Sequence, residues 1–296
     1  MPRSVIARAP TRIDFGGGWT DVPPYPETDG GCVCNVAIAR FASVQISEAS
    51  SGTHGDARLR GDQHDGGPLV AAAVRRAGLR GVQVTLRSDF PIGAGLGGSS
   101  AAGVALQGAV AAWRDEPADL DLAAIAEASR DVEVLELGVP GGRQDHYAAA
   151  FGGALGLWFT DRVEVRRIGL TERTRAELEA RMLIVYTGQS RISGDTITAV
   201  IDAYRARNAR VVGALAHMKA LAGQMIEALG GGDLDALGAL VAEHWTYQRA
   251  LHSAITTERI DAIMERARAA GALGGKALGA SGGGCVVLIA GADAAE

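Results

Sequence analysis

Short apolar runs alternate with longer alanine-rich stretches along the first half of this sequence. Residues 82–89 (VQVTLRSD) alternate apolar and polar side chains, and this period of two is typical of a half-buried β-strand. Comparable runs predict strands over residues 4–9, 32–46, 81–87, 154–159 and 182–187. A last apolar run, CVVLIA, begins at Cys285 and predicts one more strand.

Other segments have helical patterns. Residues 99–113 are almost all small and apolar, and this run is too short to span a membrane, so it predicts a buried helix. Residues 121–137 place apolar side chains at helical spacing, and further helices are predicted over 195–229, 234–251 and 257–270. A boundary near residues 157–167 divides these elements into two α+β domains, residues 1–160 and 161–296.

Glycine is the outlier of the composition. It accounts for 41 of the 296 residues, about twice the usual ~7 %. Glycine does not recur at every third position, which excludes a collagen-like chain. The content of 47 % hydrophobic residues excludes a disordered chain. The glycines therefore predict loops around a folded core.

Charge and cysteine content exclude several classes of protein. The net charge of −5 gives no basic field for nucleic acid or for an anionic membrane. Three cysteines are too few, and wrongly spaced, for a zinc site or a disulfide framework. The histidines and aspartates of residues 50–67 are interpreted as a solvated loop rather than a metal site. With no signal peptide or apolar span in the sequence, we expect a cytoplasmic protein.

The strongest local motif is PIGAGLGGSS, which leads into the predicted buried helix. Closely spaced glycines let backbone N–H groups converge, and the start of a helix adds partial positive charge, so this loop is suited to phosphate. The residues predicted to bind a nucleotide are Pro91, Gly93, Ala94, Gly95, Leu96, Gly97, Gly98, Ser99 and Ser100. No lysine follows, which excludes a P-loop, whereas a dinucleotide-binding G-x-G-x-x-G loop and a plain tight turn stay open as alternatives.

Two more glycine-rich segments stand near the ends of the chain, residues 9–21 (APTRIDFGGGWTD) and 276–285 (KALGASGGGC). The three segments in this order resemble the GHMP small-molecule kinases. GGRQDHYAAAFGG, YTGQSRIS and ITTERID extend the resemblance to a bacterial branch, the heptose 7-phosphate kinases that phosphorylate an anomeric hydroxyl. The resemblance implies a two-domain α+β fold, with a ribosomal-protein-S5-like N-terminal domain and a ferredoxin-like C-terminal domain.

The resemblance also implies catalytic roles. Asp145 matches the aspartate of the family that accepts the proton of the attacking hydroxyl, and Arg12 matches a cation that stabilises the phosphoryl group. ATP is the implied phosphoryl donor, and Ser99 and Glu133 match the residues that bind Mg²⁺. Glu136, one turn beyond Glu133, is the rival for the second position.

Substrate recognition follows the family pattern less closely. Gly18 and Trp19 stand where galactokinase-like members have glutamate and histidine, so those hydroxyl contacts cannot be transferred. The implied substrate residues are Asp14, Gly18, Thr20, Asp21, Gly142, Arg191, Gly282 and Gly283, with Arg191 as a cradle for a phosphate on the sugar. His244 and Trp245, on a predicted helix, are interpreted as packing residues.

The function implied is ATP- and Mg²⁺-dependent conversion of heptose 7-phosphate to heptose 1,7-bisphosphate. A fucose- or arabinose-type sugar 1-kinase and a C7-cyclitol phosphate kinase differ only in the sugar pocket. An NAD-dependent oxidoreductase and a non-catalytic sugar-phosphate sensor are more distant alternatives. We expect a small-molecule partner, no nucleic acid or membrane, and a monomer or homodimer.

Overall fold

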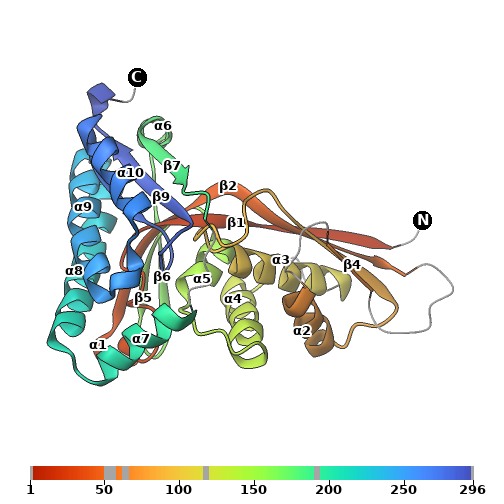
Figure 1. Ribbon diagram of the computed structural model, residues 1–296. Helices are drawn as coiled ribbons and strands as arrows, with labels where there is room; N and C mark the ends of the chain where they lie inside the picture. Colours follow the sequence, from red (N-terminus) through yellow and green to blue (C-terminus); the bar gives the residue numbers. More distant parts are fainter. Residues whose placement is uncertain (1–2, 50–57, 62–66, 116–119, 190–193, 295–296) are drawn as a thin grey trace.

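The computed structural model describes residues 3–49, 58–61, 67–115, 120–189 and 194–294 (Figure 1). The longest strand of the first sheet, β2 (Gly31–Glu48), pairs antiparallel with β1 (Ser4–Gly16) along most of its length. Its first half also pairs with β5 (Ala154–Phe159) and its second half with β4 (Val82–Ser88). The edges are β6 (Val163–Ile168) beside β5 and β3 (Arg58–Gly61) beside β4.

Helices α2 (Gly67–Ala77), α3 (Gly98–Trp113), α4 (Leu122–Asp131) and α5 (Gln144–Phe151) lie along one face of this sheet (Figure 1). The predicted helix over 121–137 is α4 followed by a π-helical turn, Val132–Glu136. The apolar side of α3 packs on β1 and β2, as the run of small residues predicts. A short helix, α1 (Tyr25–Asp29), precedes β2.

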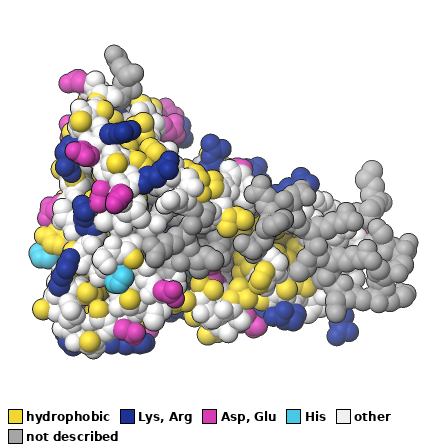
Figure 2. Space-filling view, viewed as in Figure 1, with side chains coloured by type: hydrophobic (Ala, Val, Ile, Leu, Met, Phe, Trp, Pro, Cys, Tyr) yellow, Lys and Arg dark blue, Asp and Glu magenta, His cyan; other side chains and the backbone are white. Residues whose placement is uncertain are grey.

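The second half contains a three-stranded antiparallel sheet in the order β7 (Met182–Tyr186), β9 (Cys285–Ala290) and β8 (Ala272–Ala277). Its helices are α6 (Glu172–Arg181), α7 (Gly194–Arg205), α8 (Ala209–Gly231), α9 (Leu234–Leu251) and α10 (Glu258–Ala269). On the face that Figure 2 shows, basic and acidic side chains are interspersed over this half. Among the described helices, none has both the length and the apolar character that crossing a bilayer requires.

The two halves share one hydrophobic core. Met225 and Ile226 of α8 belong to the same buried cluster as Ile13 and Phe15 of β1. The first sheet also continues past residue 160, since β6 pairs with β5. The division of the chain at residues 160 and 161 stays a prediction.

The predicted α+β class is confirmed, but several predicted bounds differ from the structure. The first strand continues beyond residue 9 to Gly16, because pairing with β2 resumes after a register shift between Pro10 and Thr11. The helix predicted over 195–229 is two helices, since Arg207 adopts a φ of 55° and Asn208 caps α8 with its side chain. The pattern missed α1, α2, α5, α6, β3, β6 and β8.

Candidate active site

Three glycine-rich segments meet at one place in the fold, although they are far apart in the sequence. They are the turn after β1, the loop between β4 and α3, and the loop between β8 and β9. The backbone N–H of Arg12 donates to the Leu96 carbonyl at 3.1 Å, and that of Cys285 donates to the Ala94 carbonyl at 2.7 Å. A Cβ on Gly95 would lie 2.6 Å from the Leu278 carbonyl oxygen, so the loops approach at distances that only glycine allows.

The loop between β4 and α3 has the geometry of an anion-binding loop. Gly93, Gly95 and Gly97 adopt φ angles of 70°, 75° and 72°, in the left-handed region that glycine accepts without strain. Such alternation turns successive N–H groups toward one concave side, and the 16-residue helix α3 begins directly afterwards. The predicted nucleotide-binding segment therefore has the backbone form that phosphate binding needs.

Gly98, the last residue before the serines of the loop, packs closely against Phe90. A Cβ at this position would lie 2.4 Å from the Phe90 ring, so a serine would not fit without moving that ring. Hydroxyl groups are supplied instead by Ser99 and Ser100 in the first turn of α3.

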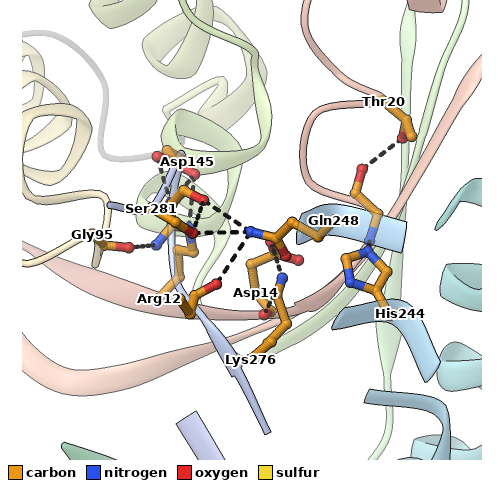
Figure 3. A network of polar contacts seen from close by, with 12 residues as sticks. Arg12, Asp14, Thr20, Gly95, Asp145, His244, Gln248, Lys276 and Ser281 are labelled. Carbon is orange, nitrogen blue, oxygen red and sulfur yellow. Dashed lines mark hydrogen bonds and ion pairs between the residues drawn. The ribbon is translucent and has the colours of Figure 1, made fainter. Parts of the chain in front are cut away.

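Arg12 and Asp145 form a bidentate ion pair beside this loop (Figure 3). Arg12 Nε and Nη2 donate to the two carboxylate oxygens of Asp145, each at 2.7 Å, and Arg12 Nη1 donates to the Gly95 carbonyl at 2.8 Å. The Arg12 side chain is 3 % exposed and that of Asp145 is 27 % exposed. Asp145 is thus a partly exposed proton acceptor, and the buried Arg12 guanidinium fixes its orientation.

Glu133 lies on the other side of the α3 terminus. Ser100 Oγ donates to Glu133 Oε2 at 3.3 Å, and His146 Nε2 lies 3.1 Å from the same oxygen. Burial alone would raise the pKa of Glu133, but hydrogen bonds from His146, Ser99 and Ser100 and the charge of His146 outweigh it and lower this pKa. Glu133 is therefore held as a carboxylate.

This donor set fits Mg²⁺. Two hydroxyls and one carboxylate are hard oxygen ligands, and Mg²⁺ usually takes only one or two carboxylates, with phosphates and water completing its shell. Among the residues that the structure describes, no group of three or more His, Cys, Asp or Glu could hold a metal ion. The rival Glu136 approaches Arg75 and Arg76 of α2 instead, at 4.0 and 3.8 Å, so the geometry favours Glu133.

Asp21 lies on the turn between β1 and β2, in contact with the start of α5. Its Oδ2 accepts from the Gln144 N–H at 2.9 Å, and the residue is 2 % exposed. Burial raises the pKa of Asp21 to about 6, the Gln144 hydrogen bond acts against this rise, and the charges of Asp145 and Asp14 add to it. A Cβ on Gly142 would lie 1.8 Å from Asp21 Oδ2, so Gly142 leaves room for the carboxylate.

Other predicted substrate residues lie in the same region of the structure and are packed against its other side chains and backbone. Thr20 is fully buried, and its hydroxyl donates to the Gly17 carbonyl at 2.7 Å and accepts from the Cys32 N–H at 3.1 Å, so here it holds the turn together. Gly18 lies against Asp14, since a Cβ there would be 2.4 Å from Asp14 Oδ2. Gly282 and Gly283 belong to the loop between β8 and β9, and Arg191 lies outside the described residues.

The sequence motifs did not reveal a second buried ion pair close to Arg12. Lys276 Nζ on β8 lies 2.7 Å from Asp14 Oδ2 and donates to the Asp14 carbonyl at 3.1 Å, and the Lys276 side chain has no exposed surface (Figure 3). Nothing in the spacing could have indicated this pair, because 262 residues separate the partners.

His244 and Gln248 of α9 complete this region (Figure 3). Burial and the charge of Lys276 lower the pKa of His244 to about 3, and its neutral ring accepts from the Gly17 N–H at 2.9 Å. The Gln248 amide donates to the Ala277 carbonyl at 3.2 Å and to Ser281 Oγ at 3.2 Å. His244 and Trp245 are buried, as predicted, and His244 also fixes the turn after β1 through Gly17.

The dinucleotide-binding alternative needs the glycine loop inside a parallel βαβ unit. The strands before and after the loop and its helix, β4 and β5, both pair antiparallel with β2. The loop therefore lacks the structural context of that alternative.

Comparison with known proteins gives matches to both halves of the chain. The family description "GHMP kinases N terminal domain" matches residues 68–153, and "GHMP kinases C terminal" matches residues 225–296. A galactokinase of Mycobacterium tuberculosis is 32 % identical, over 97 % of this chain and 89 % of its own length.

Other relatives act on other sugars. A D-glycero-alpha-D-manno-heptose 7-phosphate kinase of Campylobacter jejuni is 27 % identical, over 95 % of this chain and 88 % of its own. A bifunctional fucokinase/GDP-fucose pyrophosphorylase of Arabidopsis thaliana is also 27 % identical, and this chain spans 30 % of its length.

Among solved structures, a D-glycero-D-manno-heptose 1-phosphate kinase from Bacteroides thetaiotaomicron superposes with a TM-score of 0.76. It is 26 % identical, over 97 % of this chain and 88 % of its own.

Proposed function

The chain belongs to the GHMP kinases, and we propose that it transfers the γ-phosphoryl group of ATP to the anomeric hydroxyl of a sugar phosphate. Heptose 7-phosphate is the proposed substrate and heptose 1,7-bisphosphate the product. The observation that carries this proposal is the bidentate Arg12–Asp145 pair, placed against the glycine loop where α3 begins.

Each part of the site has a distinct task in this reaction. Phosphoryl transfer depends mainly on positioning and on charge neutralisation. The N–H groups of the glycine loop and of the first turn of α3 hold the phosphates of ATP. Asp145 accepts the proton of the attacking hydroxyl at a carboxylate oxygen, and Arg12 orients this carboxylate and adds positive charge beside the transferred group.

Ser99, Ser100 and Glu133 would hold Mg²⁺ at the start of α3. When bound, the ion neutralises charge on the phosphate oxygens. On the sugar side, Asp21 accepts hydrogen bonds from hydroxyls, while Gly18 and Gly142 leave room for the carboxylates of Asp14 and Asp21.

The proposed substrate is tested by measuring ADP release with Mg²⁺ and ATP against a panel of sugars. We expect the highest kcat/KM with heptose 7-phosphate, compared with the free heptose, fucose, arabinose and a C7-cyclitol phosphate. The fucokinase relatives make a fucose 1-kinase the second candidate, and a preference for unphosphorylated fucose would establish it instead. ATP binding without turnover on any sugar would favour a sensor.

The proposed phosphate cradle can be tested through Arg191. Arg191→Ala should raise KM for the phosphorylated sugar by about 10- to 100-fold, because one charge-assisted bidentate contact contributes roughly 1.5–3 kcal/mol. KM for ATP should stay unchanged. Steady-state kinetics with both substrates varied check this, and an equal rise in both KM values would contradict the assignment.

The raised pKa of Asp21 predicts a pH dependence. As its ionised form is the one that accepts hydrogen bonds from sugar hydroxyls, kcat/KM for the sugar should fall as pH decreases through about 6. Asp21→Asn should have a low kcat/KM without this decline. The measurement is a pH profile from 5 to 9 at saturating ATP, and an identical decline in both proteins would assign the titration to another group.

A further inference from the structure

The mechanism above gives no role to His146, a buried histidine of the site. His146 follows Asp145 on α5, and the residue is 2 % exposed. Its Nε2 lies 3.1 Å from Glu133 Oε2 and 3.4 Å from Ser100 Oγ, and its Nδ1 lies 3.0 Å from Ser129 Oγ. The ring thus joins α5 to α3, to α4 and to the π-helical turn.

The contact with Glu133 requires a hydrogen on one nitrogen of the ring. A carboxylate only accepts, so His146 Nε2 carries the hydrogen that is donated to Glu133. The Ser129 hydroxyl can donate to Nδ1 or accept from it, and this second contact fixes the orientation of the ring.

The fold makes room for this contact. A Cβ on Gly103 of α3 would lie 2.3 Å from Ser129 Oγ, so a larger residue would displace the hydroxyl. Gly103 and Ser129 are both buried, and neither contacts a substrate in the mechanism above. The small size of Gly103 lets the Ser129 hydroxyl lie where it contacts Nδ1 of His146.

Glu133 needs such a support because of its place in the chain. It belongs to the π-helical turn Val132–Glu136, where the backbone departs from the regular register of α4. Its side chain has three rotatable bonds, and a ligand of a metal ion must be held in one orientation. Hydrogen-bond partners of metal ligands supply this orientation, and their loss typically costs about 10- to 100-fold in metal affinity.

We propose that His146 is a positioning residue that orients the Glu133 carboxylate for Mg²⁺, with Ser129 fixing the imidazole ring. The inference rests on the proposed function, because it assumes a nucleotide-bound Mg²⁺ at Ser99, Ser100 and Glu133. It assigns His146 no contact with ATP or with the sugar.

The test measures ADP binding by calorimetry without sugar, once in EDTA and once over a range of Mg²⁺ concentrations. His146→Leu removes the donor, whereas His146→Gln keeps an N–H that can reach Glu133. We expect His146→Leu to need about 10- to 100-fold more Mg²⁺ for the same gain in ADP affinity. His146→Gln should regain most of this loss, and affinity in EDTA should be equal in all three proteins.

Two further variants guard against misfolding and indirect effects. Ser129→Ala leaves the imidazole in place and should also raise the Mg²⁺ requirement, which tests the proposal if His146→Leu is insoluble. In a Glu133→Gln background, His146→Leu should add no further loss, because the carboxylate to be oriented is gone.

Wild-type Mg²⁺ dependence in His146→Leu, or in Ser129→Ala if the leucine variant does not fold, overturns the proposal. The proposal is also overturned if adding His146→Leu to Glu133→Gln raises the Mg²⁺ requirement further. If the wild-type protein bound no ADP, the proposed function would fail as well. If the sugar panel failed while ADP bound normally, only the proposed substrate would be lost.

Discussion

Replacing Asp145 with asparagine should lower kcat by roughly 10²- to 10⁴-fold, the usual contribution of a positioned general base. Asparagine has nearly the same shape, and its side-chain oxygen can still accept one of the two Arg12 hydrogen bonds. It has no negative charge and cannot take the proton of the sugar hydroxyl. The KM for ATP should change little, because the glycine loop holds the phosphates through its backbone.

Steady-state kinetics at saturating ATP measure this effect. Asp115→Asn is the matched control, because its side chain is 80 % exposed and pairs with Arg3 at the surface. This control should keep wild-type kcat, as exposed ion pairs contribute only about 0–1 kcal/mol. More than a tenth of wild-type kcat in Asp145→Asn would exclude Asp145 as the base.

Replacing Lys276 with methionine should destabilise the protein by about 3–5 kcal/mol, the usual cost of removing one partner of a buried ion pair. Methionine retains the length of the side chain but leaves the Asp14 carboxylate, 3 % exposed, without its cation. Asp14 Oδ1 has no hydrogen-bond partner among the described residues, so the buried carboxylate depends on the hydrogen bond and charge of Lys276 at Oδ2. The loss is a large part of the ~5–15 kcal/mol by which proteins are usually stable.

The same pair predicts how this loss depends on pH. Burial raises the pKa of Asp14, but the charge and hydrogen bond of Lys276, with smaller effects of His244 and Arg12, outweigh it, so the folded-state pKa lies below the ordinary value of 3.8. A lowered carboxyl pKa gives stability that is present above the unfolded pKa and is lost as pH falls through the folded one. The stability difference between wild type and Lys276→Met should therefore shrink below pH 4.

Urea denaturation at pH 7.5 and at pH 3.5 provides the measurement. The chain has one other lysine, Lys219, which donates to the Asp29 carbonyl at 2.7 Å, and Lys219→Met is the control. It should cost about 1 kcal/mol, the net value of one hydrogen bond. The double variant Asp14→Asn/Lys276→Met should recover part of the loss, since no charge remains buried. Equal losses in the two single lysine variants would contradict a stabilising role of the pair.

The sequence predicted elements that carry many buried apolar residues. The predicted strand 154–159 and the predicted helix 234–251 match β5 and α9, because their apolar positions follow strand and helix packing directly. The first strand was predicted too short, since residues 10–16 carry buried polar groups of the site and no longer alternate. Strand β8 was missed because Gly274 and Gly275 are unusual in a strand, and a Cβ on Gly274 would lie 1.9 Å from the Gly238 carbonyl oxygen.

The candidate site was predicted where a motif carries the information. Arg12, the glycine loop and Asp145 were placed by their resemblance to a family, and the structure brings them together. The contact of Lys276 with Asp14 joins segments 262 residues apart, and the contact of His146 with Glu133 depends on how α5 packs against the π-helical turn. No spacing along the chain encodes these contacts, so they became visible only in three dimensions.

The most direct test of the central claim is ³¹P NMR of a reaction that contains ATP, Mg²⁺ and heptose 7-phosphate, run with the wild-type protein and with Asp145→Asn. The wild type should form ADP and an anomeric phosphate in equal amounts, with the original 7-phosphate retained, while the variant leaves both substrates unchanged over the same time. Release of inorganic phosphate without a sugar phosphate ester, or the same anomeric product at the same rate from Asp145→Asn, would contradict the account.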